Sequence, residues 1–409
     1  MTYQDYQGEF RASHEGTSAL LPPPSPSRIE QLTGLRFVAA LAVLLSHFSA
    51  LTPLPGFEFL AELGGHGVTL FFVLSGFVLT HRYDSHGSSS NSPQRSLSIK
   101  NYAWARLARI VPVYWLSLLA TLVAYNVFGA HISLGPAPAD VASGALSFAL
   151  SWFALQAWVP DVSVQQFWNA PGWSVSSEMF FYACFPLLVR FKWLSGSGRS
   201  LILTGIFFFV LLAIYLGTLV FLGNTNAEPL QFAARVPLLG VYPFVFGILA
   251  CRRWFDASPV SAKHTGASIW TLGIALVAGA WLFQKLTGQI TQATELLHAP
   301  LIFTLLWIHC WYVPMFTLLI YLLARCNGGP AHFLQSAPMK LLGNASYSLY
   351  LFHWLPLGWL IHHYGAGGGP WWVSLLAIVF LMGGSVAVYL GFEAPARLRI
   401  LKVRSTLQN

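Results

Sequence analysis

Ten long apolar stretches constrain what this chain of 409 residues can fold into. A helix needs about 20 mostly apolar residues to cross roughly 30 Å of hydrocarbon. The qualifying stretches are approximately 34–52, 64–82, 104–128, 172–190, 200–222, 236–252, 266–284, 300–323, 341–362 and 371–393. Because 55% of the residues are hydrophobic and 9% are charged, an ordinary soluble globular protein is excluded. The sequence therefore predicts an all-α, polytopic integral protein of the cell membrane with ten transmembrane helices.

The positions of the basic residues predict how these helices are oriented. With the N-terminus inside, all but two of the 22 Lys and Arg residues lie on the cytoplasmic side, the exceptions being Arg235 and Lys285. The stretch 143–158 is apolar but short. If it crossed the membrane, every later loop would change sides and this sorting would be lost. We therefore predict that 143–158 is an interfacial or re-entrant helix and that both termini are cytoplasmic.

The ends of the chain and its cysteines narrow the class further. Residues 1–30 are polar and proline-rich, without the apolar core of a signal peptide, and they predict a flexible cytosolic tail. The membrane domain is expected over 31–396, followed by a short basic cytosolic tail over 397–409. All four cysteines lie in or beside apolar stretches, which indicates neither a disulfide framework nor a metal cluster. The net charge is +8, but the basic residues are sorted by side of the membrane. The expected partner is therefore membrane lipid and not nucleic acid.

Two ionisable residues, His47 and Glu178, are predicted at similar depth in the membrane. Glu178 is the acidic residue that lies well within a predicted span, whereas Glu393 lies at the inner end of the last one. An ionisable group at that depth costs several kcal/mol unless it is paired or hydrated. Arg36 and His47 are eleven residues apart, hence on nearly one helix face and about 16 Å apart along the axis. We predict that neutral His47 is a general base facing Glu178, which orients the ring and stabilises the imidazolium.

Four arginines are predicted to lie near the inner membrane surface. Arg106 and Arg109 have i, i+3 spacing on one helix face, and Arg36 and Arg82 join them there. Guanidinium forks suit phosphate oxygens, so these side chains predict a phosphate site; anchoring to lipid headgroups is the alternative. Acyl-coenzyme A fits a basic mouth connected to a deeper base, since its pantetheine arm would present the thioester about 16 Å further in. It is expected as a donor substrate, with no permanently bound cofactor.

Five segments in order resemble the acyltransferase-3 family of integral membrane acyltransferases, over about Ile29 to Arg399. They are LTGLRFVAALAVLLSHF, GVTLFFVLSGFVL, YAWARLARIVPVYW, PGWSVSSEMFFYACFPLL and LGNASYSLYLFHW. One departure is Ser176-Ser177-Glu178, where many relatives have Ser-Val-Glu. The resemblance implies that His47 is catalytic, as a general base or as a transient acyl acceptor, and that Arg36, Arg106 and Arg109 bind the donor. It also implies substrate contacts by Trp173, Ser174, Ser75, His353 and Tyr350, although for His353 a structural hydrogen bond is an equally favoured alternative.

The resemblance also implies an activity. Members of this family transfer an acyl group, most often acetyl, from acyl-coenzyme A to a hydroxyl of a sugar or glycoconjugate. Many bacterial relatives append an extracytoplasmic hydrolase-like domain; here the membrane domain, alone or with a separate partner, is expected to complete the transfer. The alternatives are acylation of a small molecule such as a macrolide, transfer of succinyl or a longer acyl group, and transport of a glycan without chemistry. The sequence does not choose among acceptors, and the oligomeric state is open.

The predicted topology is testable by labelling with a membrane-impermeant thiol reagent in intact cells. New cysteines at Gly367 and Ala137 should react from outside, whereas one at Ser89 should not, because the basic residues place it in the cytoplasm. The parent chain, with its native cysteines, is the control. Reaction at Ser89 would overturn the ten-helix topology.

Overall fold

The computed structural model describes residues 29–84, 98–129, 136–191, 193–221, 235–257, 300–326 and 328–406, with a few isolated positions between them. Within these ranges the chain is helical and contains no strand. The helices are α2 (Glu30–Phe48), α3 (Glu58–Gly64), α4 (Gly67–Tyr83), α5 (Ile99–Phe128), α6 (Val141–Trp152), the 3-10 turn η3 (Gln156–Trp158), α7 (Val162–Gln166), α8 (Gly172–Leu188), α9 (Gly198–Phe221), α11 (Pro237–Asp256), α13 (Pro300–Arg325), α14 (Pro330–Leu334), α15 (Ala337–Phe352), α16 (Trp354–Tyr364), α17 (Trp371–Val388), the π-helical turn η5 (Tyr389–Glu393) and α18 (Ala394–Thr406).

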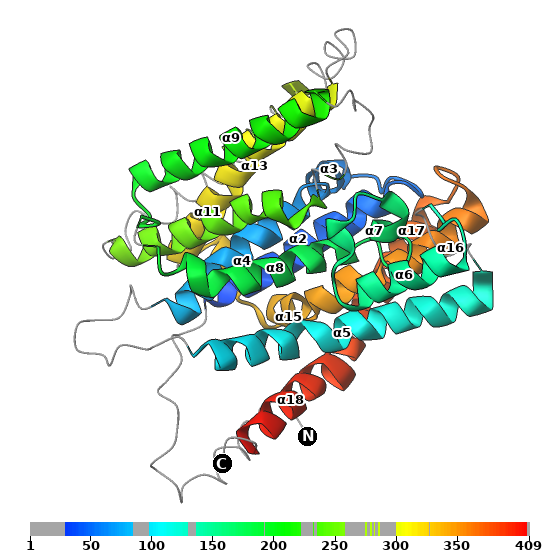
Figure 1. The fold of residues 1–409 in the computed structure, drawn as a ribbon. Helices are drawn as coiled ribbons and strands as arrows, with labels where there is room; N and C mark the ends of the chain where they lie inside the picture. The colour runs from blue at the N-terminus through cyan, green and yellow to red at the C-terminus, as the bar shows by residue number, and fades with distance from the viewer. Residues whose placement is uncertain are drawn as a thin grey trace, which may run out of the picture.

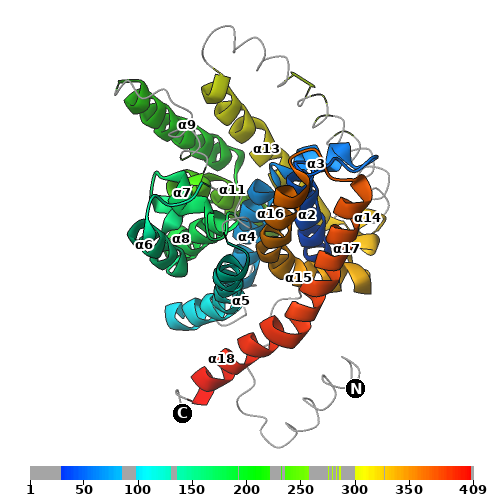
Figure 2. The ribbon, with the colours of Figure 1, turned by 90° about the vertical axis from the view of Figure 1, so that its right-hand side faces the viewer.

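Helix α2 forms the centre of the bundle. It packs against α3, α4, α13 and α15, and α4 in turn packs along α11 (Figure 1). Its apolar side chains are almost fully buried, as Leu44 and Phe48 at 1% exposure illustrate. Helix α18 continues the direction of α17 beyond η5 and extends away from the bundle (Figure 2). The predicted catalytic helix is therefore the most enclosed one, and the C-terminal helix reaches outward from it.

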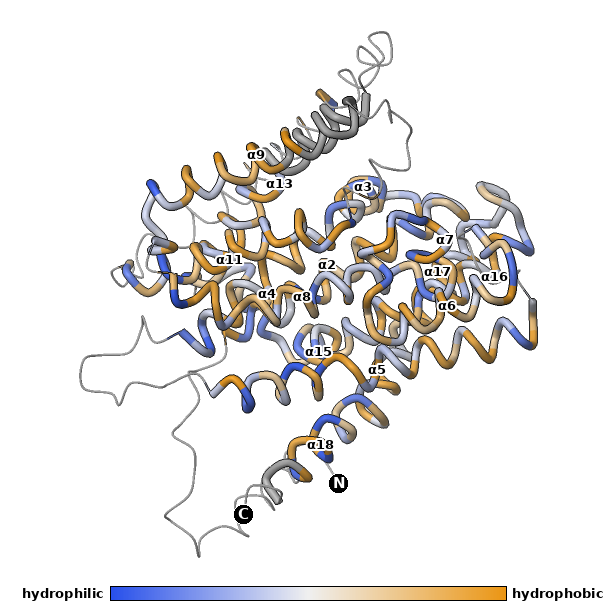
Figure 3. The backbone as a smooth tube through the Cα atoms, viewed as in Figure 1, coloured by the Kyte–Doolittle hydropathy of each residue, from blue (hydrophilic) through white to orange (hydrophobic). Residues whose placement is uncertain are grey.

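The outer faces of several helices are apolar (Figure 3). Val127 on α5 is 66% exposed and Phe380 on α17 is 78% exposed. Contiguous apolar surface of this kind is rare on soluble monomers. Among the described residues, four helical segments are long and apolar enough to cross a membrane: α2, α5, α11 and the run Trp371–Val403. A fifth arises if α3 and α4, which meet at 61°, form one bent span.

The predicted spans and the observed helices differ in several places. The stretch 341–362 is two helices, α15 and α16, separated at His353. Most of 266–284 and the N-terminal residues 1–28 lie outside the described part of the chain. Residues assigned to the basic tail from 397 are helical as far as Thr406. In the segment predicted not to cross, α6 has 12 residues and is about 18 Å long, too short for a span.

Glycines allow two pairs of helices to approach closely. On α4, a Cβ atom at Gly76 would collide with the carbonyl oxygen of Phe244; on α11, one at Gly247 would collide with that of Val73. Gly343 of α15 meets the backbone of α2 in the same way. Small residues let helix backbones pack at short range, which is how helices associate where lipid removes the hydrophobic driving force. These contacts hold α4 and α15 against their neighbours around the centre of the bundle.

A buried arginine closes the end of the bundle where α4 and α11 terminate. The Arg252 side chain is 1% exposed, and its Nε donates to Oδ2 of Asp84 at 2.7 Å. Its other nitrogens donate to three backbone carbonyls of the segment that joins α8 to α9, namely those of Val189, Phe191 and Leu194. A buried charge is tolerated because it is paired and hydrogen-bonded; removing one partner of such a pair costs about 3–5 kcal/mol. Arg252 therefore joins three segments.

The close contact of α4 and α11 generates a stability prediction. Gly247→Ala should lower the melting temperature of the detergent-purified protein, because the new methyl group meets backbone and forces a shift costing about 1–3 kcal/mol. The matched control is Gly383→Ala on α17, where a Cβ has open space. There the same substitution should be neutral or stabilise by up to about 1 kcal/mol. Equal melting temperatures for the two variants would contradict close packing at Gly247.

Candidate functional site

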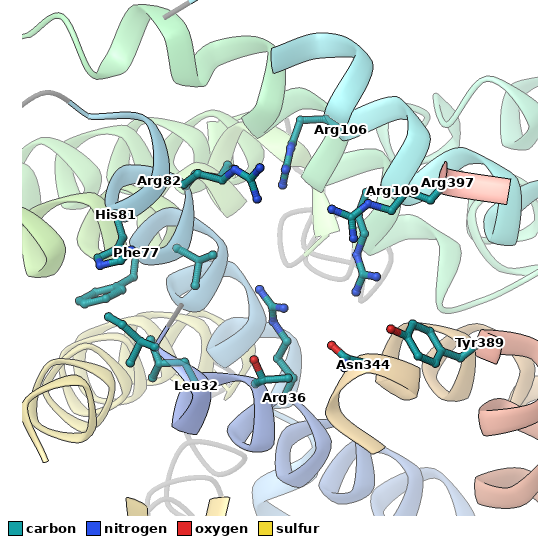
Figure 4. A pocket seen from close by; sticks show the side chains of 14 residues that line it. Leu32, Arg36, Phe77, His81, Arg82, Arg106, Arg109, Asn344, Tyr389 and Arg397 are labelled. Carbon is teal, nitrogen blue, oxygen red and sulfur yellow. The ribbon is translucent and has the colours of Figure 1, made fainter. Parts of the chain in front are cut away.

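An arginine-lined cavity of about 330 Å³ lies between α2, α4, α5, α15 and α18. Its basic side chains are Arg36 from α2, Arg82 from α4, Arg106 and Arg109 from α5, and Arg397 from α18. Figure 4 shows these guanidinium groups converging on one space from four helices, with two of them on α5. All four arginines predicted to bind the donor are thus brought together. Arg397 was not among the predicted donor contacts, because residues 397–409 were predicted to be a short cytosolic tail.

The charge of this cavity is only partly balanced. Arg109 forms an ion pair of 2.6 Å with Glu393, which is 2% exposed and also accepts a hydrogen bond from Ser348. Arg106 lies over the rings of Tyr83 and Tyr182, at 5.7 Å from each ring centre, so its long side chain is held against aromatic faces. None of the described residues lining the cavity is acidic. A cavity lined by several guanidinium groups, with no acidic side chain among its described lining residues, suits a polyanion.

A second, narrower cavity of about 100 Å³ continues from the first. The two share Arg36, Arg106 and Arg109 as lining residues. Beyond the arginines, α4, α8 and α15 contribute polar side chains to the lining, together with apolar ones from α4, α5 and α8. These polar lining residues include Ser75, Ser174, Glu178, Tyr182 and Tyr350. Glu178 accepts a hydrogen bond from Ser75 at 3.1 Å and another, short one from Tyr182.

The two histidines of the predicted site form a pair. Nδ1 of His47 lies 2.8 Å from Nε2 of His353, and the two ring planes are nearly parallel, at 8°, with their centres 5.0 Å apart. His353 lies between α15 and α16 and is 1% exposed, whereas His47 is partly exposed. The edge of Trp354 completes the surroundings, 5.4 Å from the His47 ring. His47 thus has a well-defined partner, but that partner is a second imidazole.

His47 and Glu178 were predicted to face each other, but the structure shows no hydrogen bond between them. Each has its own hydrogen-bond partners: His353 for His47, and Ser75 and Tyr182 for Glu178. The expectation was based on equal depth in the membrane. Depth does not fix the rotation of a helix about its axis, so it cannot determine which neighbour a side chain faces. Neither histidine is among the described residues that line the two cavities.

Tyr350 lines the second cavity and also contacts His353. Its ring centre lies 5.9 Å from that of His353, and its hydroxyl is 2.9 Å from the Ser174 hydroxyl. Three of the predicted substrate contacts, Ser75, Ser174 and Tyr350, therefore line the second cavity. Trp173 instead packs edge to face against Phe72, at 6.2 Å between ring centres. Among the described residues, no three metal-ligating side chains converge.

In its described part the protein is all-helical and contains a strongly basic cavity. Comparison with known sequences identifies its family. Residues 29–390 match the family model of the acyltransferase-3 family, which describes an acyltransferase domain. The chain therefore belongs to the acyltransferase-3 family and is an acyltransferase. No solved structure matches the chain.

Individual relatives are similar over most of this chain. Acyltransferase MdmB of Streptomyces mycarofaciens is 27% identical, with 88% of this chain and 90% of that protein covered. O-acetyltransferase OatA of Staphylococcus aureus is 23% identical, with 91% of this chain and 58% of OatA covered. Peptidoglycan O-acetyltransferase OatA of Listeria monocytogenes is also 23% identical, with 80% and 49% covered. The chain thus spans about half to three-fifths of the length of these two OatA proteins.

The arginine cavity predicts which basic residues affect binding of a phosphorylated donor. Arg36→Ala and Arg397→Ala should each raise the apparent KM for acyl-coenzyme A by about 10- to 150-fold, since a charge-assisted phosphate contact contributes about 1.5–3 kcal/mol. Arg36→Lys should recover part of the loss, because a point charge cannot reproduce a two-pronged contact. Steady-state kinetics of the purified variants measures both effects.

The control for this prediction lies on the same helix. Arg399 is exposed and does not line the cavity. Arg399→Ala removes the same charge from α18 and should leave the donor KM within about twofold of the parent value. If Arg397→Ala and Arg399→Ala behave alike, α18 contributes general surface charge and not a donor contact.

Proposed function

We propose that this protein is a multi-pass membrane O-acyltransferase that moves an acyl group, acetyl in the simplest case, from acyl-coenzyme A to a hydroxyl of a sugar or glycoconjugate. The observation that carries the proposal is the arginine cavity and its continuation into a narrower polar cavity beside the histidine pair. A large charged end and a thin, neutral arm are the shape of acyl-coenzyme A.

The donor would be held by its phosphates in the first cavity. A volume of about 330 Å³ is in the range of small-molecule sites. The arginines there match an anion of several charges better than a single carboxylate, since each guanidinium can bind oxygens with two parallel hydrogen bonds. The pantetheine arm would then enter the second cavity, where Ser75, Ser174 and Glu178 offer polar contacts, and would direct the thioester toward Tyr350.

The membrane arrangement that suits this donor is the one predicted from the basic residues. With ten helices and both termini cytoplasmic, the arginine cavity opens toward the cytoplasm, where acyl-coenzyme A is made. The exposed apolar faces of α5 and α17 then contact lipid in the cell membrane. His47, near the other end of α2, would meet an acceptor that arrives from the opposite side.

Chemistry at His47 would proceed by general-base catalysis. As the acceptor hydroxyl attacks the thioester carbonyl carbon, His47 takes the hydroxyl proton and a C–O bond forms. The C–S bond then breaks, and the departing thiolate takes that proton from the imidazolium, which restores the neutral base. We infer that the Tyr350 side chain, which lines the second cavity and contacts His353, would leave its contact with Ser174 to let the thioester reach His47. Glu178 would act on the donor arm in the second cavity.

The polar path argues against transport without chemistry. A glycan transporter needs a continuous polar route, and among the described residues neither cavity extends to the histidine pair. A decisive experiment incubates the detergent-purified protein with labelled acetyl-coenzyme A and a panel of acceptors, including sugars, peptidoglycan fragments and macrolides. Release of free coenzyme A in proportion to modified acceptor supports an acyltransferase and identifies the acceptor. Acceptor binding without coenzyme A release would contradict the proposal.

The proposed base predicts a specific kinetic pattern. His47→Ala should lower turnover by about 10²- to 10⁴-fold while donor binding, measured by equilibrium titration, persists. Glu178→Gln should also lower turnover. Because the two residues have different hydrogen-bond partners, their losses should multiply in the double variant. A double variant no worse than His47→Ala would show that they act as one unit after all. Near-normal turnover of His47→Ala would refute the mechanism.

A further inference from the structure

The surroundings of His353 determine which of its nitrogens carries a hydrogen. Its Nδ1 lies 2.7 Å from the backbone carbonyl oxygen of Tyr350. A carbonyl oxygen can only accept a hydrogen bond, so Nδ1 of His353 must be the donor. In a neutral imidazole the other nitrogen then carries a lone pair and accepts. Nε2 of His353 is therefore an acceptor, and it points at His47.

The same reasoning determines which ring nitrogen of His47 carries a hydrogen. Its Nδ1 lies 2.8 Å from Nε2 of His353, which accepts, so Nδ1 of His47 must donate. Nε2 of His47 is then left with the lone pair. We propose that His353 is a positioning residue that holds His47 in the Nδ1–H tautomer, which makes Nε2 of His47 the basic nitrogen. This inference rests on the proposed function of His47 and adds to it the reacting atom and the group that selects it.

The arrangement also gives His47 a hydrogen-bond acceptor once its ring is protonated. When Nε2 of His47 takes the hydroxyl proton, the ring becomes a cation and the hydrogen on Nδ1 stays where it is. The bond from that Nδ1 to Nε2 of His353 becomes charge-assisted and hence stronger. His353 thus performs, as a neutral acceptor, the task that the sequence analysis assigned to Glu178. Its burial and its anchor on the Tyr350 carbonyl keep the acceptor in place.

Three substitutions at His353 separate this role from a structural one. His353→Gln places an amide oxygen near the position of Nε2, where it can accept from His47, so its turnover should stay within about tenfold of the parent. His353→Asn can bond the Tyr350 carbonyl but is too short to reach His47, and His353→Leu fills similar space without an acceptor. Both should lower turnover by about 10²-fold or more, the scale expected when a catalytic histidine has the wrong tautomer, with the donor KM unchanged.

A second measurement does not depend on activity. Nitrogen NMR of the ¹⁵N-histidine-labelled protein, with the His47 signals identified by their loss in His47→Ala, reports which ring nitrogen is protonated. The parent and His353→Gln should show hydrogen on Nδ1 of His47, and His353→Leu should show it redistributed toward Nε2. Hydrogen on Nε2 of His47 in the parent would overturn the inference.

The outcomes distinguish the two proposals. Equal turnover of His353→Gln and His353→Asn, whether high or low, would also overturn the positioning role, even if His47→Ala is inactive and the proposed function stands. A changed acceptor KM in all three variants would assign His353 to direct substrate contact. Full turnover in His47→Ala would instead remove the proposed function on which the inference rests.

Discussion

The ion pair between Arg109 and Glu393 is the interaction on which the arginine cavity depends. It links α5 to the π-helical turn η5, and Ser348 on α15 donates to the second carboxylate oxygen, so three helices meet at one buried acid. Several guanidinium groups facing one space repel each other, and a buried carboxylate beside them lowers that cost. The π-helical turn places Glu393 there, in keeping with the frequent occurrence of such turns at functional sites. The same turn sends α18 outward, which brings Arg397 into the cavity wall.

Part of this site could be predicted from the sequence because it depends on local spacing. Arg106 and Arg109 share a helix face by their i, i+3 separation, and Arg36 follows from the position of the first apolar stretch. Arg397 could not be found this way, since its approach depends on how α18 leaves the bundle. The apolar stretches likewise gave an all-helical chain, while the division of 341–362 at His353 was missed, because the residues around the break are as apolar as a continuous span.

The histidine pair shows a different limit of sequence analysis. Depth along a helix can be counted in residues, and that count predicted similar levels for His47 and Glu178. Which side chains meet depends on the rotation and tilt of each helix, and these are set by backbone contacts such as that of Gly343 with α2. A single sequence carries little information on such angles. The partner of His47 therefore emerges from tertiary packing alone.

The contact between Tyr350 and Ser174 has a consequence for the energy supply of the cell. An enzyme that accepts a donor from one compartment and an acceptor from another needs polar groups through most of the bilayer thickness, and an unbroken file of them would conduct protons and small ions. In the arrangement proposed above, the Tyr350 side chain would lie across that file and would insulate it between catalytic events. In the topology proposed, such a plug would let the protein reach both compartments without discharging the ion gradient that the membrane maintains.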